Sequence, residues 1–259
     1  MTSPVRICMI GAGRVGKLHS GTLRRHVPGG EVVALVDPHR PILDETGDQF
    51  AIDRRYASLE EALDAAEFEA VVITTPTPTH RDLAVLAAER GKHVFLEKPM
   101  ALSLAECDDI LRATSAHGVI LQMGFMRRFD PDFATAWERI EGGEIGEVML
   151  IKSLTHGPGL PPPWATDLKT SNGNLAEVNS HDLDTSRWLS ASTPLRMYVE
   201  VANFKGAERG VTSDHYYDNM FATIKFESGA MANVSGVCPC DYGYDSRVEI
   251  IGKKGIMQI

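Results

Sequence analysis

The chain has 259 residues, of which 43% are hydrophobic and 24% are charged, and its formal net charge at neutral pH is −9. This composition is typical of a folded globular chain with one large domain or two ordinary ones, and it excludes a disordered tail, a collagen or a low-complexity linker. The acidic balance argues against a nucleic-acid-binding surface or a polybasic membrane patch.

Four cysteines are too few for a disulfide framework, and the spacing of Cys238 and Cys240 is not a zinc spacing. No apolar run approaches the ~20 residues that span a bilayer. The amino terminus leads within a few residues into a short apolar strand pattern and then glycines, unlike a secretory signal peptide. We therefore expect free thiols and a cytoplasmic protein.

The chain opens with the pattern of a dinucleotide-binding unit. Residues 4–10 are nearly all apolar and predict a buried strand, followed at once by the glycine turn Gly11-Ala12-Gly13-Arg14-Val15-Gly16. A helical pattern follows the turn, and residues 31–36 predict a second strand that ends at Asp37. Gly11 would allow a tight turn, Gly13 a close approach of pyrophosphate, and Gly16 close packing of helix on strand. The alternative is a glycine turn in another α/β fold.

Asp37 also bears on the choice of cofactor. It stands about 20 residues after the glycines, where a carboxylate accepts hydrogen bonds from the adenosine ribose hydroxyls. The same carboxylate would repel the 2′-phosphate of NADP, so we expect NAD, with NADP less favoured. Arg40 could pair with that phosphate and keeps the preference from being absolute.

Strands and helices continue to alternate up to about residue 123. Residues 70–73, 93–96 and 119–121 predict strands, and residues 59–63, 83–88 and 102–117 predict helices. This rhythm indicates a doubly wound parallel sheet, whose ligand lies at the carboxyl ends of the strands. The residues that we expect to bind cofactor there are Gly11, Ala12, Gly13, Arg14, Val15, Gly16, Asp37, Thr75, Pro76, His80, Glu97 and Lys98.

The rhythm changes in the second half of the chain. Helices are predicted over residues 131–141 and 173–190, with a strand starting near residue 146 and a proline-rich loop over 158–163. Strand patterns then follow one another over 195–204, 215–227, 230–237, 247–251 and 255–259. Adjacent strands without helices indicate an antiparallel sheet. We expect a Rossmann domain over residues 1–123 and an α+β domain with a large, mainly antiparallel open sheet over residues 124–259.

Two groups of side chains could perform chemistry. Lys98 ends a strand between Glu97 and Pro99, where its ammonium could polarise a substrate oxygen, and the bond before Pro99 is a candidate for the cis form. Glu177, His181 and Asp184 share one face of a helix predicted to be continuous. His181 could transfer a proton near neutral pH and Glu177 could orient it. An exposed polar stripe is the plain alternative, and a metal site lacks a fourth ligand.

Three motifs resemble the glucose–fructose oxidoreductase and inositol dehydrogenase (Gfo/Idh/MocA) family: the glycine turn, Glu97-Lys98-Pro99 and His181-Asp182-Leu183-Asp184. Two stretches, 124–131 and 242–245, resemble its inositol 2-dehydrogenase branch. The resemblance implies that Lys98 and His181 are the catalytic pair and that the open sheet makes oligomer contacts, giving a homodimer or homotetramer. Glu177 stands where family members commonly have Asp, and Asn172-Gly173-Asn174 replaces the usual Gly-Gly. The family also continues beyond Ile259, so a C-terminal segment is expected to be missing.

These observations together predict an NAD-dependent dehydrogenase of a cyclitol or sugar. His181 would accept the hydroxyl proton, Lys98 would bind the same oxygen, and no metal would be needed. The residues expected to contact substrate are Lys98, Arg127, Trp164, Asn179, His181 and Tyr244. Two alternatives remain open at this stage. One is reduction of a keto sugar, amino sugar or aminocyclitol in biosynthesis, and the other is a non-catalytic cofactor-binding regulator.

Overall fold

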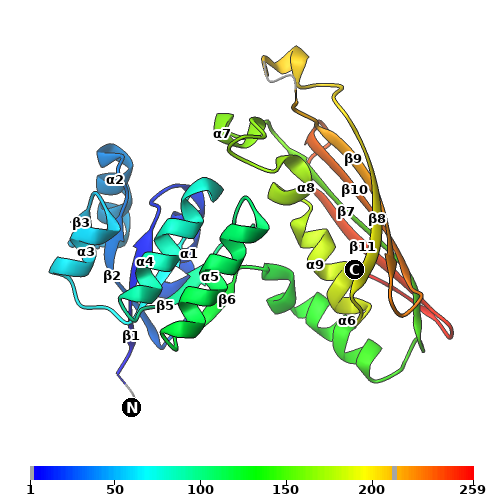
Figure 1. Cartoon of the computed structure of the whole chain (residues 1–259), viewed down its shortest axis with the longest axis horizontal. Coiled ribbons are helices and arrows are strands. Elements are labelled where there is room, and N and C mark those ends of the chain that lie inside the picture. Colours follow the sequence, from blue (N-terminus) through cyan, green and yellow to red (C-terminus); the bar gives the residue numbers. More distant parts are fainter. Residues whose placement is uncertain (1–2, 212–214) are drawn as a thin grey trace. The chain divides into compact units, whose positions relative to one another are not determined.

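The computed structural model describes residues 3–211 and 215–259. The first two residues of the predicted Rossmann domain, and residues 212–214 of the predicted second domain, lie outside the described residues. The chain divides into two compact units, Met1–Gly124 and Phe125–Ile259, which we call unit 1 and unit 2 (Figure 1).

Unit 1 is built on a six-stranded sheet in the order β3-β2-β1-β4-β5-β6. Its strands are β1 (Val5–Ile10), β2 (Gly30–Val36), β3 (Arg55–Tyr56), β4 (Ala70–Ile73), β5 (His93–Leu96) and β6 (Leu121–Met123). Every pairing is parallel, which confirms the predicted doubly wound sheet. The strand order reverses between β1 and β4, and such a switch point is where open α/β sheets bind their ligands.

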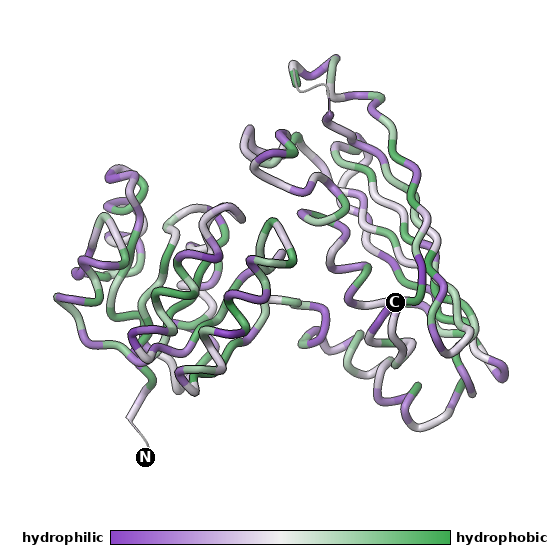
Figure 2. The backbone as a smooth tube through the Cα atoms, in the orientation of Figure 1, coloured by the Kyte–Doolittle hydropathy of each residue, from purple (hydrophilic) through white to green (hydrophobic). Residues whose placement is uncertain are grey.

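Helices connect the strands of unit 1 and bury both faces of the sheet. They are α1 (Arg14–His26), α2 (Arg40–Phe50), α3 (Leu59–Ala65), the 3₁₀ helix η1 (Thr77–Thr79), α4 (His80–Glu89) and α5 (Leu104–Ala116). Alternate residues of β1 enter different cores: Cys8 and Ile10 pack on one side, Ile7 and Met9 on the other. The strands are accordingly among the most hydrophobic parts of unit 1 in Figure 2. Cys8 is fully buried, as predicted for a small apolar side chain.

Unit 2 carries a second six-stranded sheet, in the order β12-β11-β7-β10-β9-β8. Its strands are β7 (Val148–Pro158), β8 (Pro194–Ala202), β9 (Asn219–Phe226), β10 (Met231–Cys240), β11 (Asp245–Gly252) and β12 (Ile256–Gln258). The pairing of β7 with β10 is parallel and the other pairings are antiparallel, which confirms the predicted mainly antiparallel sheet.

The helices of unit 2 precede most of its strands. They are η2 (Met126–Phe129), α6 (Pro131–Glu141), α7 (Pro163–Thr166), α8 (Gly173–Glu177), α9 (Ser180–Leu189) and the 3₁₀ helix η3 (Ala207–Arg209). Helix α9 packs on β7 and β10, and α8 packs on β9 and β10. The core between helices and sheet includes Leu189, Ile151, Ala222 and Val234.

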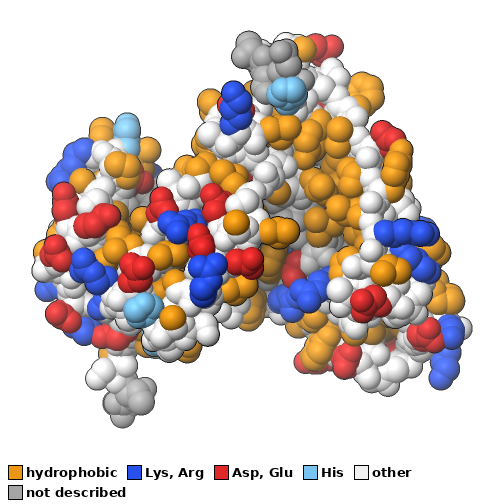
Figure 3. Space-filling view, viewed as in Figure 1, with side chains coloured by type: hydrophobic (Ala, Val, Ile, Leu, Met, Phe, Trp, Pro, Cys, Tyr) orange, Lys and Arg blue, Asp and Glu red, His pale blue; other side chains and the backbone are white. Residues whose placement is uncertain are grey.

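Two further features concern the length of the helices and the charges on the surface of unit 1. Over the part of the chain that the structure describes, no helix is both long and apolar enough to cross a membrane. The face of unit 1 seen in Figure 3 carries acidic and basic side chains close together over α4 and α5. Arg81 of α4 pairs with Asp109 of α5 at 2.9 Å.

Candidate functional site

The glycine turn between β1 and α1 has a geometry that larger residues would not permit. Gly11 has a φ of +97°, and a methyl group there would lie 2.8 Å from Thr74 Oγ1. A methyl group at Gly16 would lie 1.9 Å from the carbonyl oxygen of Gly11, so glycine is needed for the close packing of α1 on β1. At Gly13, by contrast, a methyl group would meet no described atom within 4 Å. The backbone at Gly13 is therefore open to a ligand.

The first turn of α1 is suited to an anion. Helix α1 begins at Arg14, and no side chain of the described residues caps its amino end. Its first N–H groups therefore remain for a phosphate, which the helix dipole also favours. The open backbone at Gly13 and this uncapped helix end fit the pyrophosphate of a dinucleotide.

Asp37 is held beside the glycine turn by two backbone hydrogen bonds. Its Oδ2 accepts from the N–H of Ala12 at 2.8 Å, and its Oδ1 accepts from the N–H of His39 at 2.8 Å. A carboxylate has four lone-pair sites, so both oxygens can still accept from ribose hydroxyls. Arg40 donates to Asp44 at 2.8 Å and holds the pKa of that carboxyl below its usual value.

The turn after β5 is fixed by a pair that the sequence analysis missed. Glu97 Oε1 lies 2.7 Å from His19 Nε2, and Glu97 Oε2 accepts from the backbone N–H of Lys98 at 3.2 Å. His19 belongs to α1, and its one sequence signal is its position a single helical turn after Gly16. The peptide bond between Lys98 and Pro99 is cis, the form suggested by the sequence.

The predicted cofactor residues gather at one edge of the first sheet because they follow β1, β2, β4 and β5. After β4, Thr75 accepts a hydrogen bond from Thr79 at 2.6 Å and Pro76 is exposed. His80 is only 1% exposed, and both of its ring nitrogens contact backbone carbonyls. Its place in cofactor binding can therefore be only indirect.

The structure corrects the single helix predicted over residues 173–190. Helix α8 ends at Glu177, a turn follows at Val178 and Asn179, and α9 starts at Ser180. The break occurs where the side chain of Asn179 bonds to the carboxylate of Asp182 at 2.8 Å and to the carbonyl of Ser235 at 3.3 Å. Glu177 and His181 therefore stand in two different helices, and only His181 and Asp184 belong to the same one.

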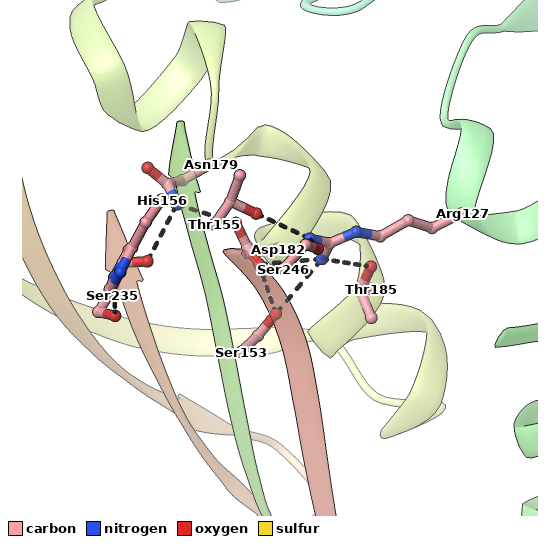
Figure 4. Close-up of polar contacts among 9 residues, drawn as sticks. All are labelled: Arg127, Ser153, Thr155, His156, Asn179, Asp182, Thr185, Ser235 and Ser246. Carbon is pink, nitrogen blue, oxygen red and sulfur yellow. Dashed lines mark hydrogen bonds and ion pairs between the residues drawn. The ribbon is translucent and has the colours of Figure 1, made fainter. Parts of the chain in front are cut away.

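A buried ion pair connects the start of unit 2 to α9 (Figure 4). Arg127 of η2 donates to Asp182 at 2.9 Å, with side chains 5% and 0% exposed. The second terminal nitrogen of Arg127 donates to Thr155 at 2.7 Å and to Ser246 at 2.6 Å. Ser153 donates to Asp182 at 2.5 Å, so both charges are surrounded by hydrogen-bond partners.

This network changes the interpretation of two residues predicted to contact substrate. Arg127 is 4% exposed and Asn179 is fully buried. The guanidinium of Arg127 and the amide nitrogen of Asn179 bond within unit 2, whereas the amide oxygen of Asn179 is buried without a hydrogen-bond partner among the described residues. Both bond the carboxylate of Asp182, the residue that follows His181 in α9. His181 itself lies in the first turn of α9, with its ring edge-to-face against Phe125 at a centroid distance of 6.3 Å.

A second histidine on β7 extends this polar region, as Figure 4 shows. His156 Nε2 lies 3.0 Å from Ser235 Oγ, and its Nδ1 contacts the hydroxyl of Tyr242. Burial lowers the pKa of His156, while the nearby carboxylate of Asp245 opposes that shift. No motif or spacing distinguished His156 in the sequence.

Trp164 and Tyr244 occupy accessible positions. Trp164 is half-buried in α7, and its carbonyl accepts from Thr170 at 2.6 Å. Tyr244 follows β10 and its side chain is exposed. Among the described residues, no group of three or more histidine, cysteine or carboxylate side chains is arranged to hold a metal ion.

Comparison with known proteins gives matches along nearly the whole chain. Residues 5–125 match the oxidoreductase family GFO/IDH/MocA, described as an NAD-binding Rossmann fold, and residues 133–258 match the GFO/IDH/MocA C-terminal domain. The scyllo-inositol 2-dehydrogenase (NAD(+)) of Bacillus subtilis (strain 168) is 36% identical, over 98% of this chain and 73% of the relative.

Two further relatives also match this chain over nearly its whole length. The inositol 2-dehydrogenase of Rhizobium meliloti (strain 1021) is 33% identical, over 97% of this chain and 74% of the relative. The crystal structure of myo-inositol 2-dehydrogenase from Lactobacillus plantarum superposes with a TM-score of 0.91 at 26% identity. That superposition covers 99% of this chain and 76% of the solved one.

Proposed function

The chain belongs to the Gfo/Idh/MocA oxidoreductase family, and we propose that it oxidises a secondary alcohol of a cyclitol or sugar to a ketone, with NAD as hydride acceptor. One observation carries the proposal. The dinucleotide cradle at Gly11–Gly16 and Asp37 occurs in a chain that matches a named scyllo-inositol 2-dehydrogenase over 98% of its length. The proposed activity is therefore inositol 2-dehydrogenase-like.

Three side chains have proposed roles in the reaction. His181 accepts the proton of the substrate hydroxyl, because imidazole is the side chain best matched to proton transfer near neutral pH. Lys98 donates to the same oxygen and stabilises its developing negative charge. Glu177 orients His181 from the end of α8. When bound, NAD supplies the acceptor for the hydride that leaves the ring carbon.

The cofactor preference rests on Asp37. Its carboxylate binds the ribose diol of NAD and repels the additional phosphate of NADP. Arg40, the candidate partner of that phosphate in the sequence, binds Asp44. We therefore propose that NAD is the preferred cofactor.

Trp164 and Tyr244 are the proposed contacts for the apolar faces of the substrate ring. An aromatic face offers large contact area to C–H groups at low conformational cost. Lys98 and His181 supply the polar contacts at the reacting hydroxyl. Because Arg127 and Asn179 are buried, we assign them to the support of α9 and not to contact with substrate.

A substrate screen tests the proposal. The protein is incubated with myo-inositol, scyllo-inositol, other cyclitols and common aldoses, with NAD and NADP in parallel. The absorbance of NADH or NADPH is followed. We expect turnover of at least one cyclitol with NAD and slower turnover with NADP. Incubation of the ketone products with NADH tests the reverse reaction, in which the ketone is reduced. Absence of turnover in every combination, with NADH binding intact, would contradict the proposed function.

A further inference from the structure

His80 makes two contacts that one neutral imidazole cannot satisfy. It is the first residue of α4 and is 1% exposed. Its Nδ1 lies 2.8 Å from the carbonyl oxygen of Pro99, and its Nε2 lies 2.9 Å from the carbonyl oxygen of Thr75. Both partners are backbone carbonyls, which only accept hydrogen bonds.

The number of protons on the ring therefore decides how many of these two contacts are hydrogen bonds. Neutral histidine has one N–H, so it donates to one carbonyl and points a lone pair at the other. Imidazolium has two N–H groups and satisfies both carbonyls. The observed geometry matches the doubly protonated ring, whereas a neutral ring makes only one of the two hydrogen bonds.

The contacts of His80 with Thr75 and Pro99 form a bridge between two turns of unit 1. These turns carry residues that we propose to bind cofactor and substrate. Thr75 follows β4, and Pro99 follows Lys98 in the turn after β5. These strands are neighbours in the sheet, with Ile73 paired to Leu96. A bond from His80 to each turn fixes the spacing of their backbones beyond the point where the sheet's own hydrogen bonds end.

Burial is the main influence on the acidity of His80. Burial lowers the pKa of His80. The two carbonyls, the carboxylate of Glu97 and the backbone of Met100 oppose this shift without cancelling it. Glu97 is itself paired with His19. The other charges on the packed helices point outward: Arg81 and Asp82 of α4 pair with each other, and Arg81 also pairs with Asp109 of α5. The ring therefore gains its second proton at a pH below the ordinary histidine range.

We propose that His80 is a positioning residue that fastens the Thr75 turn to the Lys98–Pro99 turn, with one hydrogen bond when neutral and two when protonated. Its effect reaches the cofactor and Lys98 only through these two backbone carbonyls. The part of this inference that concerns the cofactor rests on the proposed function, since it requires dinucleotide binding at these turns. The part that concerns the protonation of the His80 ring does not depend on the proposed function.

The ring protons can be counted directly. The protein labelled with ¹⁵N-histidine, without any ligand, is titrated by NMR, and His80 is assigned by loss of its signals in His80→Gln. We expect one protonated ring nitrogen near neutral pH and two at acid pH, with the transition below the ordinary value of ~6.5. A His80 ring that keeps a single proton throughout the range in which the protein is folded would overturn the proposal.

Cofactor affinity tests the positioning role. In His80→Gln the amide can donate to one carbonyl at any pH, so it imitates the neutral ring. The Kd for NADH, measured by fluorescence without alcohol substrate, should match wild type within about two-fold near pH 8. At a pH below the His80 transition found by NMR it should be about five-fold weaker than wild type, the scale of one hydrogen bond. The exposed His117→Gln is the matched control and should follow wild type at both pH values.

The outcomes separate this inference from the proposed function. A His80→Gln to wild-type ratio of Kd that is the same at both pH values would contradict the positioning role, since a merely structural histidine gives no such pH dependence. If His80→Gln does not fold, the signals are assigned from spectra of the wild type and the count of ring protons decides. A wild-type protein with the expected NMR titration and NADH binding but no turnover in the substrate screen would overturn the proposed function and leave this inference standing.

Discussion

At the scale of single residues, Asp37 is the side chain on which we expect cofactor preference to depend. Its carboxylate is already fixed by the N–H groups of Ala12 and His39, so it needs no rearrangement to meet a ribose diol. Replacing Asp37 with Ser should remove the repulsion of the 2′-phosphate and reduce the ratio of kcat/KM for NAD over NADP by about ten-fold or more. Wild-type protein that favours NADP would contradict this assignment.

Lys98 is the residue on which turnover should depend most strongly within unit 1. Lys98→Ala removes the proposed donor to the substrate oxygen, and the loss of such a donor costs about 100-fold or more in kcat. The Kd for NADH, measured by fluorescence, should change much less. Lys92→Ala is a suitable control, since Lys92 lies before β5 and bonds the carbonyl of Phe68. Near wild-type turnover by Lys98→Ala would contradict the proposed mechanism.

The sequence identified the residues whose roles depend on local geometry. The three glycines could be assigned because a tight turn and close helix packing are properties of neighbouring residues. Arg127 and His80 could not, because their environments are built by residues far away in the chain. Arg127 meets Asp182 and Ser246 only after β7, α9 and β11 have packed together. His80 meets Pro99 only across neighbouring strands.

At the scale of elements, strands were easier to predict than helix boundaries. The apolar runs at residues 70–73 and 93–96 correspond to β4 and β5, because buried parallel strands have a plain hydrophobic signature. Helix α2 (Arg40–Phe50) was not predicted, since its apolar residues are few and Gly47 interrupts it. The break between α8 and α9 depends on contacts of Asn179 with β10, which no local pattern reveals.

The Arg127–Asp182 pair should be the main support of α9. Arg127→Met leaves Asp182 buried and charged, and breaking a buried pair in this way costs about 3–5 kcal/mol in the free energy of unfolding. Urea denaturation measures this change. Arg127→Met combined with Asp182→Leu should recover a large part of the loss, because both charges are then removed. Arg139→Met, which breaks the exposed pair with Glu144, serves as control and should have a much smaller effect. Equal stability of Arg127→Met and wild type would refute this role.

At the scale of the whole molecule, the sheet of unit 2 presents apolar side chains that a monomer would leave exposed. Strand β8 lies at the sheet edge, and its exposed Tyr198 is on the same face of the sheet as the exposed Phe221 of the adjacent β9. Exposed apolar sheet surface of this kind is typical of protein–protein contacts. We expect a homodimer or homotetramer formed through this sheet.

Light scattering after size-exclusion chromatography tests the expected assembly. Phe221→Lys should shift the protein toward the monomer mass, because it places a charge in the proposed contact. Leu104→Lys changes an even more exposed apolar residue in α5 of unit 1 and should leave the mass unchanged. A wild-type protein that is monomeric at all concentrations would contradict the expectation.

The central claim is that the protein moves a hydride from a ring carbon of a cyclitol or sugar to NAD. Its most direct test uses the best substrate from the screen, deuterated at its ring carbons, with unlabelled NAD. Mass spectrometry of the reduced cofactor should show one deuterium per molecule formed, and His181→Ala should reduce the amount of labelled product to a small fraction. Reduced cofactor without deuterium, or no reduced cofactor from any substrate while NADH still binds, would contradict the claim.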